Sequence, residues 1–244
     1  MVQGDDLGMC RAVNEGTELA ATEGVLTQTS VMAPTPWFAE GAAMAKRIGV
    51  PVGLHVTLTC EWDFLRWAPL SPAPSLRGVD GTFHRTVEEA ATAVPAEAIA
   101  EAHAQAGRAV ALGLQLTYVD PHMGVSVVPA YTAICERFGV KFIYRPLEPH
   151  HVWTSLIILS LAPLEDRAAW FVERLEQIGA GTHFVLSHPA VSSPELRAIT
   201  PEDAPNADWA EPIRVADLEA LCDPAARKVI ERRGIELVGV RDLD

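Results

Sequence analysis

The sequence predicts an α/β protein, a single-domain (βα) barrel with about seven parallel strands. Short runs rich in β-branched and aromatic residues alternate with amphipathic helical segments along all 244 residues. Strands separated by helices usually pair in parallel, through right-handed crossovers. The length of the chain and its 49% content of apolar residues suit one large domain, residues 1–244.

Seven segments have the composition of strands, and most of them are followed by a helical pattern. The predicted strands are Met1–Gln3, Thr29–Met32, Val52–Thr59, Leu116–Asp120, Lys141–Tyr144, Thr182–Leu186 and Leu237–Val240. The predicted helices are Ala12–Glu23, Trp37–Arg47, Ala96–Ala111, Ala130–Phe138, Leu164–Ile178, Val215–Leu221 and Pro224–Arg233. Glycines at 24, 49, 139 and 179 follow four of these helices, as is typical of helix ends.

Two segments interrupt the alternation. Residues 60–86 and 192–212 are rich in proline, and the first also contains several glycines and aromatic residues. Both are too long for a plain connection between a strand and a helix. We expect the loop 60–86 to lie over the rim of the barrel.

Composition excludes several classes of partner. The net charge of −13 argues against nucleic acid or an anionic membrane. The four cysteines are scattered and indicate free thiols in a reducing compartment. No secretory signal or membrane span is recognisable, which predicts a cytoplasmic protein. Only four residues precede the first acidic pair, so a longer native N-terminus is an alternative.

Ionisable side chains occur at four of the predicted strands. They are Asp5 and Asp6, His55, Asp120 and His122, and His188. The carboxyl ends of barrel strands form one rim, and active sites are built there. We therefore expect these side chains to converge, although each alone has a simpler interpretation. His55 could be a core histidine, and the acidic pair could be a solvent-facing turn or a helix N-cap.

A carboxylate and two imidazoles suit Zn²⁺ or another first-row divalent ion, with positions left for water and substrate. Such an ion would also explain the acidic pair. One aspartate would bind the metal, and the other would stay ionised beside it and take a proton from the attacking water. His188 could then protonate a leaving group. Five other histidines lack this placement and are interpreted as structural or surface residues: His84, His103, His150, His151 and His183.

With these residues the chain resembles the YdjC family, the ChbG/HpnK-type deacetylases of N-acetylated sugars. The resemblance extends over nearly the whole chain and rests on several motifs in order. They are Gly4-Asp5-Asp6-Leu7-Gly8, Asn14-Glu15-Gly16, Gly24-Val25-Leu26-Thr27, Thr29-Ser30-Val31-Met32, Gly53-Leu54-His55-Val56-Thr57-Leu58-Thr59, Val119-Asp120-Pro121-His122, Ser187-His188-Pro189, Arg214-Val215-Ala216-Asp217-Leu218-Glu219-Ala220-Leu221 and Gly234-Ile235-Glu236-Leu237.

The resemblance implies a divergent barrel related to the polysaccharide deacetylases. It implies one divalent metal ion, Zn²⁺ or Mg²⁺ first and Mn²⁺ or Co²⁺ as alternatives, and an N-acetylated carbohydrate as substrate. A homo-oligomer is expected because homo-oligomers are common. The implied roles are metal ligand for Asp6, His55 and His122, general base for Asp5, general acid for His188, and orientation of the base for Arg145.

Aromatic residues of the long loop have two interpretations. Trp62, Phe64 and Trp67 could form an apolar platform for a sugar ring, or they could fix the loop to the barrel. Cys10 could approach the site through the turn after Gly8, but no paired histidine marks it as a nucleophile.

The chain departs from the family at two points. It lacks the usual Asn-Ala-Asp-Asp-Phe-Gly opening, and Met123-Gly124 replaces the histidines that often follow the ligand at 122. The substrate of any one branch is therefore not transferred to this chain. Two alternatives remain: a barrel that binds carbohydrate or metal without turnover, and a hydrolase of another small amide or ester. A nucleotide-dependent enzyme ranks low, because neither GxGxxG nor GxxxxGK[ST] occurs.

Overall fold

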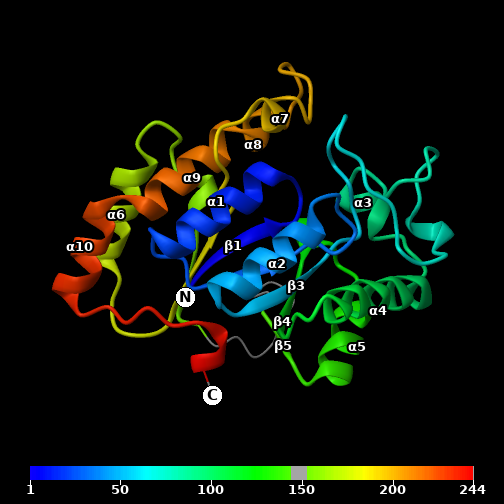
Figure 1. Cartoon of the computed structure of the whole chain (residues 1–244), viewed down its shortest axis with the longest axis horizontal. Coiled ribbons are helices and arrows are strands. Elements are labelled where there is room, and N and C mark those ends of the chain that lie inside the picture. Colours follow the sequence, from blue (N-terminus) through cyan, green and yellow to red (C-terminus); the bar gives the residue numbers. More distant parts are fainter. Residues whose placement is uncertain (144–152, 244) are drawn as a thin grey trace.

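Seven parallel strands form one curled sheet, a half-barrel, in the computed structural model, which describes residues 1–143 and 153–243 (Figure 1). The strand order across the sheet is β5-β4-β3-β2-β1-β7-β6. The strands are β1 Val2–Leu7, β2 Gln28–Val31, β3 Val52–Val56, β4 Leu116–Pro121, β5 Lys141–Phe142, β6 Ser155–Ile158 and β7 His183–Ser187. This arrangement confirms the predicted α/β barrel design with about seven parallel strands.

Helices follow most of the strands and cover the convex face of the sheet. The longer helices are α1 Arg11–Thr22, α2 Phe38–Ile48, α4 Pro95–Ala111, α5 Val128–Phe138, α6 Arg167–Gln177, α9 Pro212–Cys222 and α10 Pro224–Arg233. The short helices are η1 Pro74–Leu76, α3 Val87–Ala90, η2 His122–Gly124, η3 Leu159–Leu161, α7 Pro194–Arg197, α8 Ala207–Ala210 and η4 Val240–Asp242. The seven predicted helices all correspond to long helices of the structure.

One predicted strand is wrong. Leu237–Val240 has strand composition, but it pairs with no described strand, and Val240 begins the short helix η4. The seventh strand is instead β6, whose four half-buried residues form an edge of the sheet beside β7. A run of four residues is too short to show the alternation that marks a strand. The start of η4 still contacts the sheet, because the Val240 amide donates to Oε1 of Gln28 in β2 at 2.8 Å.

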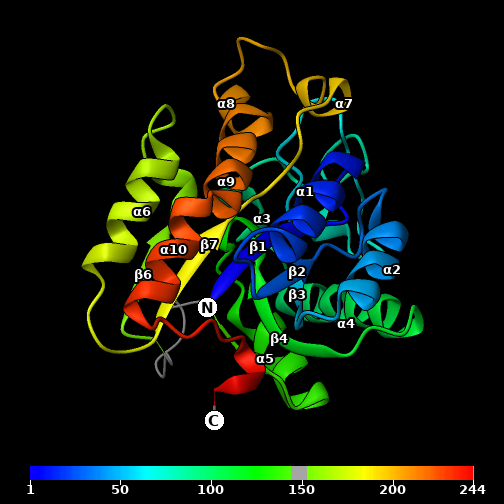
Figure 2. The ribbon, with the colours of Figure 1, turned by 60° about the vertical axis from the view of Figure 1, so that its left-hand side comes forward.

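Apolar side chains divide into three groups around the sheet. The largest lies between β1–β4 and the helices α1, α2, α4 and α5. A second lies under α6, α9 and α10, which run side by side over β6 and β7 (Figure 2). A third, which includes Tyr118, Ile143, Trp153 and Phe184, lies on the concave side. Its place there leaves room for a cavity inside the curl of the sheet.

The long loop after β3 is an ordered part of the core. Trp62, Trp67 and Phe83 are buried in the largest apolar group, and a β-bridge joins Arg77 to Phe83. The rest of the segment therefore packs on itself and on α4, while its start approaches the concave face. None of the helices in the described ranges has the length and apolar character needed to cross a bilayer.

Two glycines on the convex face differ in the space around them, and alanine substitutions there should have opposite effects on stability. A Cβ on Gly16 of α1 would lie 2.4 Å from the Ala190 Cα, whereas a Cβ on Gly107 of α4 would meet no atom within 4 Å. Gly16→Ala should lower the free energy of unfolding by about 1–3 kcal/mol through overpacking. The control Gly107→Ala should raise it by about 0.5–1 kcal/mol, because alanine is the better helix former. Urea unfolding measures both, and equal effects would contradict the packing described.

Candidate metal and catalytic site

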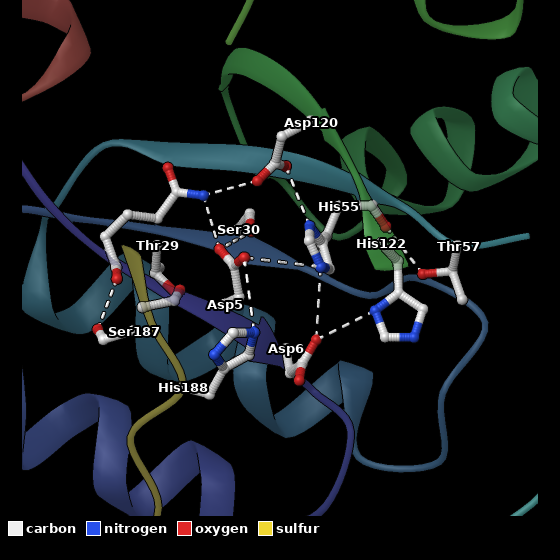
Figure 3. Close-up of polar contacts among 12 residues, drawn as sticks. Asp5, Asp6, Thr29, Ser30, His55, Thr57, Asp120, His122, Ser187 and His188 are labelled. Atoms are coloured by element: carbon white, nitrogen blue, oxygen red, sulfur yellow. Dashed lines mark hydrogen bonds and ion pairs between the residues drawn. The ribbon is translucent and has the colours of Figure 1, made fainter. Parts of the chain in front are cut away.

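A cavity of about 550 Å³ lies on the concave face at the carboxyl ends of the strands. The five side chains predicted to carry metal binding and catalysis all line it and point toward one another, as Figure 3 shows for Asp5, Asp6, His55, His122 and His188. Their convergence follows from the topology, since parallel strands bring their carboxyl ends to one edge. The predicted Arg145 lies outside the described residues.

The acidic pair lies inside β1 rather than after it, which corrects the predicted end of this strand at residue 3. Side chains of adjacent strand residues normally point to opposite faces. Here the register with β2 shifts between Gly4 and Leu7, and Asp6 has a φ of 69°. A left-handed backbone at a non-glycine residue costs free energy and is found mainly at functional sites. The irregularity turns Asp6 so that it lines the same cavity as Asp5.

Asp6, His55 and His122 form a group that could hold a metal ion. Asp6 Oδ1 lies 3.4 Å from His55 Nε2 and 3.3 Å from His122 Nδ1, and the three ligand atoms lie within 4.8 Å of one another. Asp6 Oδ1 is buried and accepts no hydrogen bond in the described part of the chain. A buried carboxylate oxygen facing two imidazole nitrogens fits a divalent ion of the first transition row.

Each of these imidazoles has a second carboxylate at its other nitrogen. Asp120 Oδ1 lies 3.2 Å from His55 Nδ1, and Glu61 Oε2 lies 3.1 Å from His122 Nε2. Such partners orient metal-binding histidines and raise their basicity. The sequence placed Asp120 at a strand end without giving it a role, and it missed Glu61. The position of Glu61 just beyond the predicted strand 52–59 was the one available clue.

A second set of potential ligands, Asp5, His55 and Asp120, lies beside the first. One oxygen of each of its carboxylates is already paired. Gln3 Nε2 donates to Asp5 Oδ1 and to Asp120 Oδ2, at 2.6 Å in both cases, and Ser30 Oγ donates to Asp5 Oδ1 at 3.0 Å. The group around Asp6 is the better site for a first-row divalent ion, because it offers two imidazole nitrogens instead of one.

Negative charge dominates the cavity. Four carboxylates line it, those of Asp5, Asp6, Glu61 and Asp120, and Arg214 is the one lysine or arginine among the described lining residues. Burial alone would raise the pKa of Asp6, but Arg214 and the two histidines hold that pKa well below its usual range. Arg214 Nη2 donates to Asp6 Oδ2 at 2.7 Å. The sequence had assigned an arginine role only to Arg145.

The same negative charge raises the pKa values of the two histidines. Burial lowers the pKa of His122, yet Glu61 and Asp6 outweigh it and raise this pKa to about 9. The pKa of His55 is likewise raised well above its ordinary value, against burial, by Asp120 and Asp5. Both shifts have the same cause, the excess of negative charge around the two imidazoles.

His188 is held by a network that sequence reasoning missed. Its Nδ1 lies 2.8 Å from Ser160 Oγ, which donates its proton to Asp217. Asp217 also accepts from the His188 backbone amide at 2.8 Å and from Arg167 Nη1 at 2.7 Å. Because the Ser160 proton is committed, Ser160 must accept from His188 Nδ1–H. The other ring nitrogen, Nε2, faces the cavity 3.9 Å from Asp5 Oδ2.

Burial shifts the pKa values of the base and acid candidates in opposite directions. Burial raises the pKa of Asp5, with an added contribution from Asp120, while His55 and His188 oppose the shift. Burial lowers the pKa of His188, against the two aspartates of β1. Burial thus favours the uncharged form of each side chain, and the two pKa values move toward each other.

The three aromatic residues of the long loop differ in their position relative to the cavity. Trp62 lines the cavity beneath the Arg214 guanidinium, 5.7 Å from ring to Cζ. Trp67 is buried outside the cavity lining, donates to the Thr59 carbonyl at 2.8 Å and packs edge-on against His122. Phe64 is 69% exposed. The role of Trp62 and Trp67 in substrate binding stays a prediction.

Cys10 does not line the cavity. It is fully buried in the largest apolar group, and burial raises its pKa to about 11. A thiol with such a pKa is a poor nucleophile at neutral pH.

The fold and the site agree with a known family. Residues 1–232 match the family described as YdjC-like protein, and the chain belongs to it. A carbohydrate deacetylase from Brevibacillus brevis is 38% identical over 144 residues, which cover 58% of this chain and 56% of the relative. A carbohydrate deacetylase from Geobacillus stearothermophilus is 29% identical over 99% of this chain and 96% of its own length.

Two solved structures share the fold. A protein from Enterococcus faecalis V583 named for cellobiose-phosphate cleavage has a TM-score of 0.83 and 20% identity, covering 99% of this chain and 97% of its own. A peptidoglycan N-acetylglucosamine deacetylase has a TM-score of 0.56 and 10% identity, with 99% and 86% covered. These neighbours confirm the predicted relation to the polysaccharide deacetylase fold.

Metal affinity should depend on the side chains at both nitrogens of His122. After removal of metal with a chelator, His122→Ala should bind almost no added Zn²⁺, because it loses a ligand. Glu61→Gln should bind it about 10–100-fold more weakly. Competition with a chromophoric chelator measures both, with His103→Ala on α4 as a control that keeps wild-type affinity. Full metal occupancy in His122→Ala would refute the ligand assignment.

Proposed function

We propose that this chain is a metal-dependent hydrolase that removes the acetyl group from an N-acetylated sugar or a related small amide. The observation that carries the proposal is the convergence of a metal-binding group, Asp6, His55 and His122, with Asp5 and His188 in one cavity. The names of relatives support the substrate class. One of them, a chitooligosaccharide deacetylase from Enterobacter, is 26% identical over 100% of this chain and 98% of its own length.

One divalent ion, Zn²⁺ or Mg²⁺ before Mn²⁺ or Co²⁺, would be held by Asp6, His55 and His122. When bound, this ion would act as a Lewis acid on the amide carbonyl and favour ionisation of the attacking water. Asp120 and Glu61 fix the two imidazoles from behind. This support leaves the histidines little freedom to turn away when substrate enters.

Asp5 would be the general base. Its Oδ1 is occupied by hydrogen bonds from Gln3 and Ser30, so Oδ2 remains to accept a proton from water. Oδ2 lies 3.9 Å from His55 Nε2 and 3.9 Å from His188 Nε2, between the metal group and the acid candidate. A water attacking a carbonyl at this point would have the base within reach.

His188 would be the general acid. Since Nδ1 donates to Ser160, the second proton of the charged ring lies on Nε2, which faces the cavity. Before water is deprotonated, the negative charges of Asp6 and Asp5 favour this charged form against the effect of burial, and the Nε2 proton would then pass to the amine nitrogen. As the C–N bond breaks, the products would be a carboxylate and a free amine.

Two alternatives keep the same site but change its use. A barrel that binds carbohydrate or metal without turnover would bind ligands but show equal, background activity in wild type and Asp5→Ala. A hydrolase of another small amide or ester would release acid from other substrates.

Three further expectations stay predictions. They are a cytoplasmic location, an association into homo-oligomers and a covering role for the loop 60–86.

A screen for acetate release tests the proposal directly. The metal-free protein is loaded in turn with Zn²⁺, Mn²⁺, Co²⁺ and Mg²⁺ and incubated with N-acetylated mono- and disaccharides. We expect acetate release with at least one metal and none after chelation. Release that is indifferent to chelation would contradict metal dependence and revive the nucleotide-dependent alternative.

Asp5→Asn should separate metal binding from turnover. The amide keeps the size of the side chain but cannot accept the proton, so kcat should fall by about 10²–10⁴-fold while metal content stays at the wild-type level. Steady-state kinetics and elemental analysis on the same sample measure the two effects. Wild-type kcat in Asp5→Asn would exclude Asp5 as the base.

Ser160 should act as a positioning residue for His188. Ser160→Ala removes the hydrogen bond that fixes the ring, worth about 1–2 kcal/mol, so kcat should fall by about tenfold with little change in KM. Ser155→Ala is a matched control, because Ser155 Oγ lies 2.7 Å from Nδ1 of His183, the first residue of β7. A pH profile that shifts in Ser160→Ala but not in Ser155→Ala would support this role. Equal losses in the two variants would contradict it.

A further inference from the structure

The cavity has two faces of opposite character. Its polar face carries the metal-binding and catalytic side chains of Asp5, Asp6, His55, His122 and His188. The opposite face is formed by β6 and β7, whose inward side chains are apolar and paired across the two strands: Ile158 beside Leu186, and Leu156 beside Phe184. Four apolar side chains in two register pairs form a continuous wall, here called the β6–β7 wall.

The β6–β7 wall extends inward from the catalytic rim. Leu186 and Phe184 belong to β7 and precede His188, the residue just after this strand, by two and four positions, which places them roughly 7 and 13 Å deeper at about 3.3 Å per residue. Ile143 and Trp153 also line the cavity, and both belong to the apolar group on the concave side. These six apolar side chains line one continuous part of the cavity that begins next to His188 and is here called the column.

Gln3, the polar residue of β1 before Asp5, has little hydrogen-bonding capacity left for a sugar. Gln3 lines the cavity two residues before Asp5, but its amide donates to both Asp5 and Asp120, and its Oε1 accepts from Gln28 at 2.8 Å. Sugar hydroxyls placed against the β6–β7 wall would lose their hydrogen bonds to water, which is costly. The sugar belongs at the polar rim, and the column suits another part of the substrate.

An acetyl group is too small to use the column. Its two carbons would reach only the pair of the β6–β7 wall nearest the rim, Ile158 and Leu186, and would leave Leu156 and Phe184 uncovered. We infer that the substrate carries an N-acyl chain longer than acetyl, of about four to eight carbons, and that this chain lies along the β6–β7 wall. The inference rests on the proposed function, because the acyl chain can lie along the wall only if its carbonyl is bound at the site that would hydrolyse it.

A series of N-acyl glucosamines tests the inference. The metal-loaded protein is assayed for amine release from N-acetyl-, N-butyryl-, N-hexanoyl- and N-octanoyl-glucosamine. We expect kcat/KM to rise by about fourfold per added methylene until the column is filled. Octyl N-acetylglucosaminide, with the alkyl group on the sugar, should gain little. A flat or falling series with acetyl turned over would overturn the inference while leaving the proposed function intact.

Two neighbouring isoleucines of β6 provide matched variants. Ile158 lines the cavity, whereas Ile157 packs on the opposite face against the apolar group under α6, α9 and α10. Both are half-buried, and threonine keeps the branched shape that suits a strand. Ile158→Thr should lower the hexanoyl-to-acetyl ratio of kcat/KM at least threefold, and Ile157→Thr should leave it unchanged. Equal ratios in the two variants, or a preference for the octyl glycoside, would overturn the placement.

A binding measurement separates this inference from the proposed function. Sodium hexanoate should bind the metal-free protein at least tenfold more tightly than sodium acetate by calorimetry, and Ile158→Thr should weaken hexanoate binding alone. If no acyl sugar is hydrolysed but hexanoate binds in this way, the hydrolase proposal fails and the apolar binding site stands. If hexanoate binds no better than acetate, the inference fails whatever the enzyme hydrolyses.

Discussion

The structure depends on a buried excess of negative charge. Asp5 and Asp6 are adjacent in β1, and Glu61 and Asp120 face the same cavity, with Arg214 as the one permanent cation of the described lining. Burying several carboxylates is costly unless cations are present. The same negative charge raises the pKa values of His55 and His122. A site of this composition suits a divalent cation.

Each surrounding element contributes to holding that charge in one place. The irregular register of β1 turns two neighbouring carboxylates to one side, which a regular strand cannot do. Helix α9 brings Arg214 to Asp6, and one turn later it brings Asp217 to the network around His188. The strands β6 and β7 supply an apolar wall instead of further charge. A polar reaction centre and an apolar column therefore share one cavity.

The sequence predicted the parts that depend on local pattern. Strand composition and the placement of Asp6, His55 and His122 at strand ends were enough to predict the barrel and the convergence. The supporting groups were not predictable, because nothing along the chain indicates that Ser160 meets His188 or that Glu61 meets His122. The edge strand β6 was missed for a related reason: its identity comes from pairing with β7, and four residues carry too little pattern alone.

The position of a bound metal ion is the central claim, and anomalous diffraction from crystals soaked with Zn²⁺ measures it most directly. The account predicts one peak within about 2.0–2.2 Å of Asp6 Oδ1, His55 Nε2 and His122 Nδ1. A peak between Asp5, His55 and Asp120 instead, or no ordered peak in the cavity at saturating metal, would contradict it.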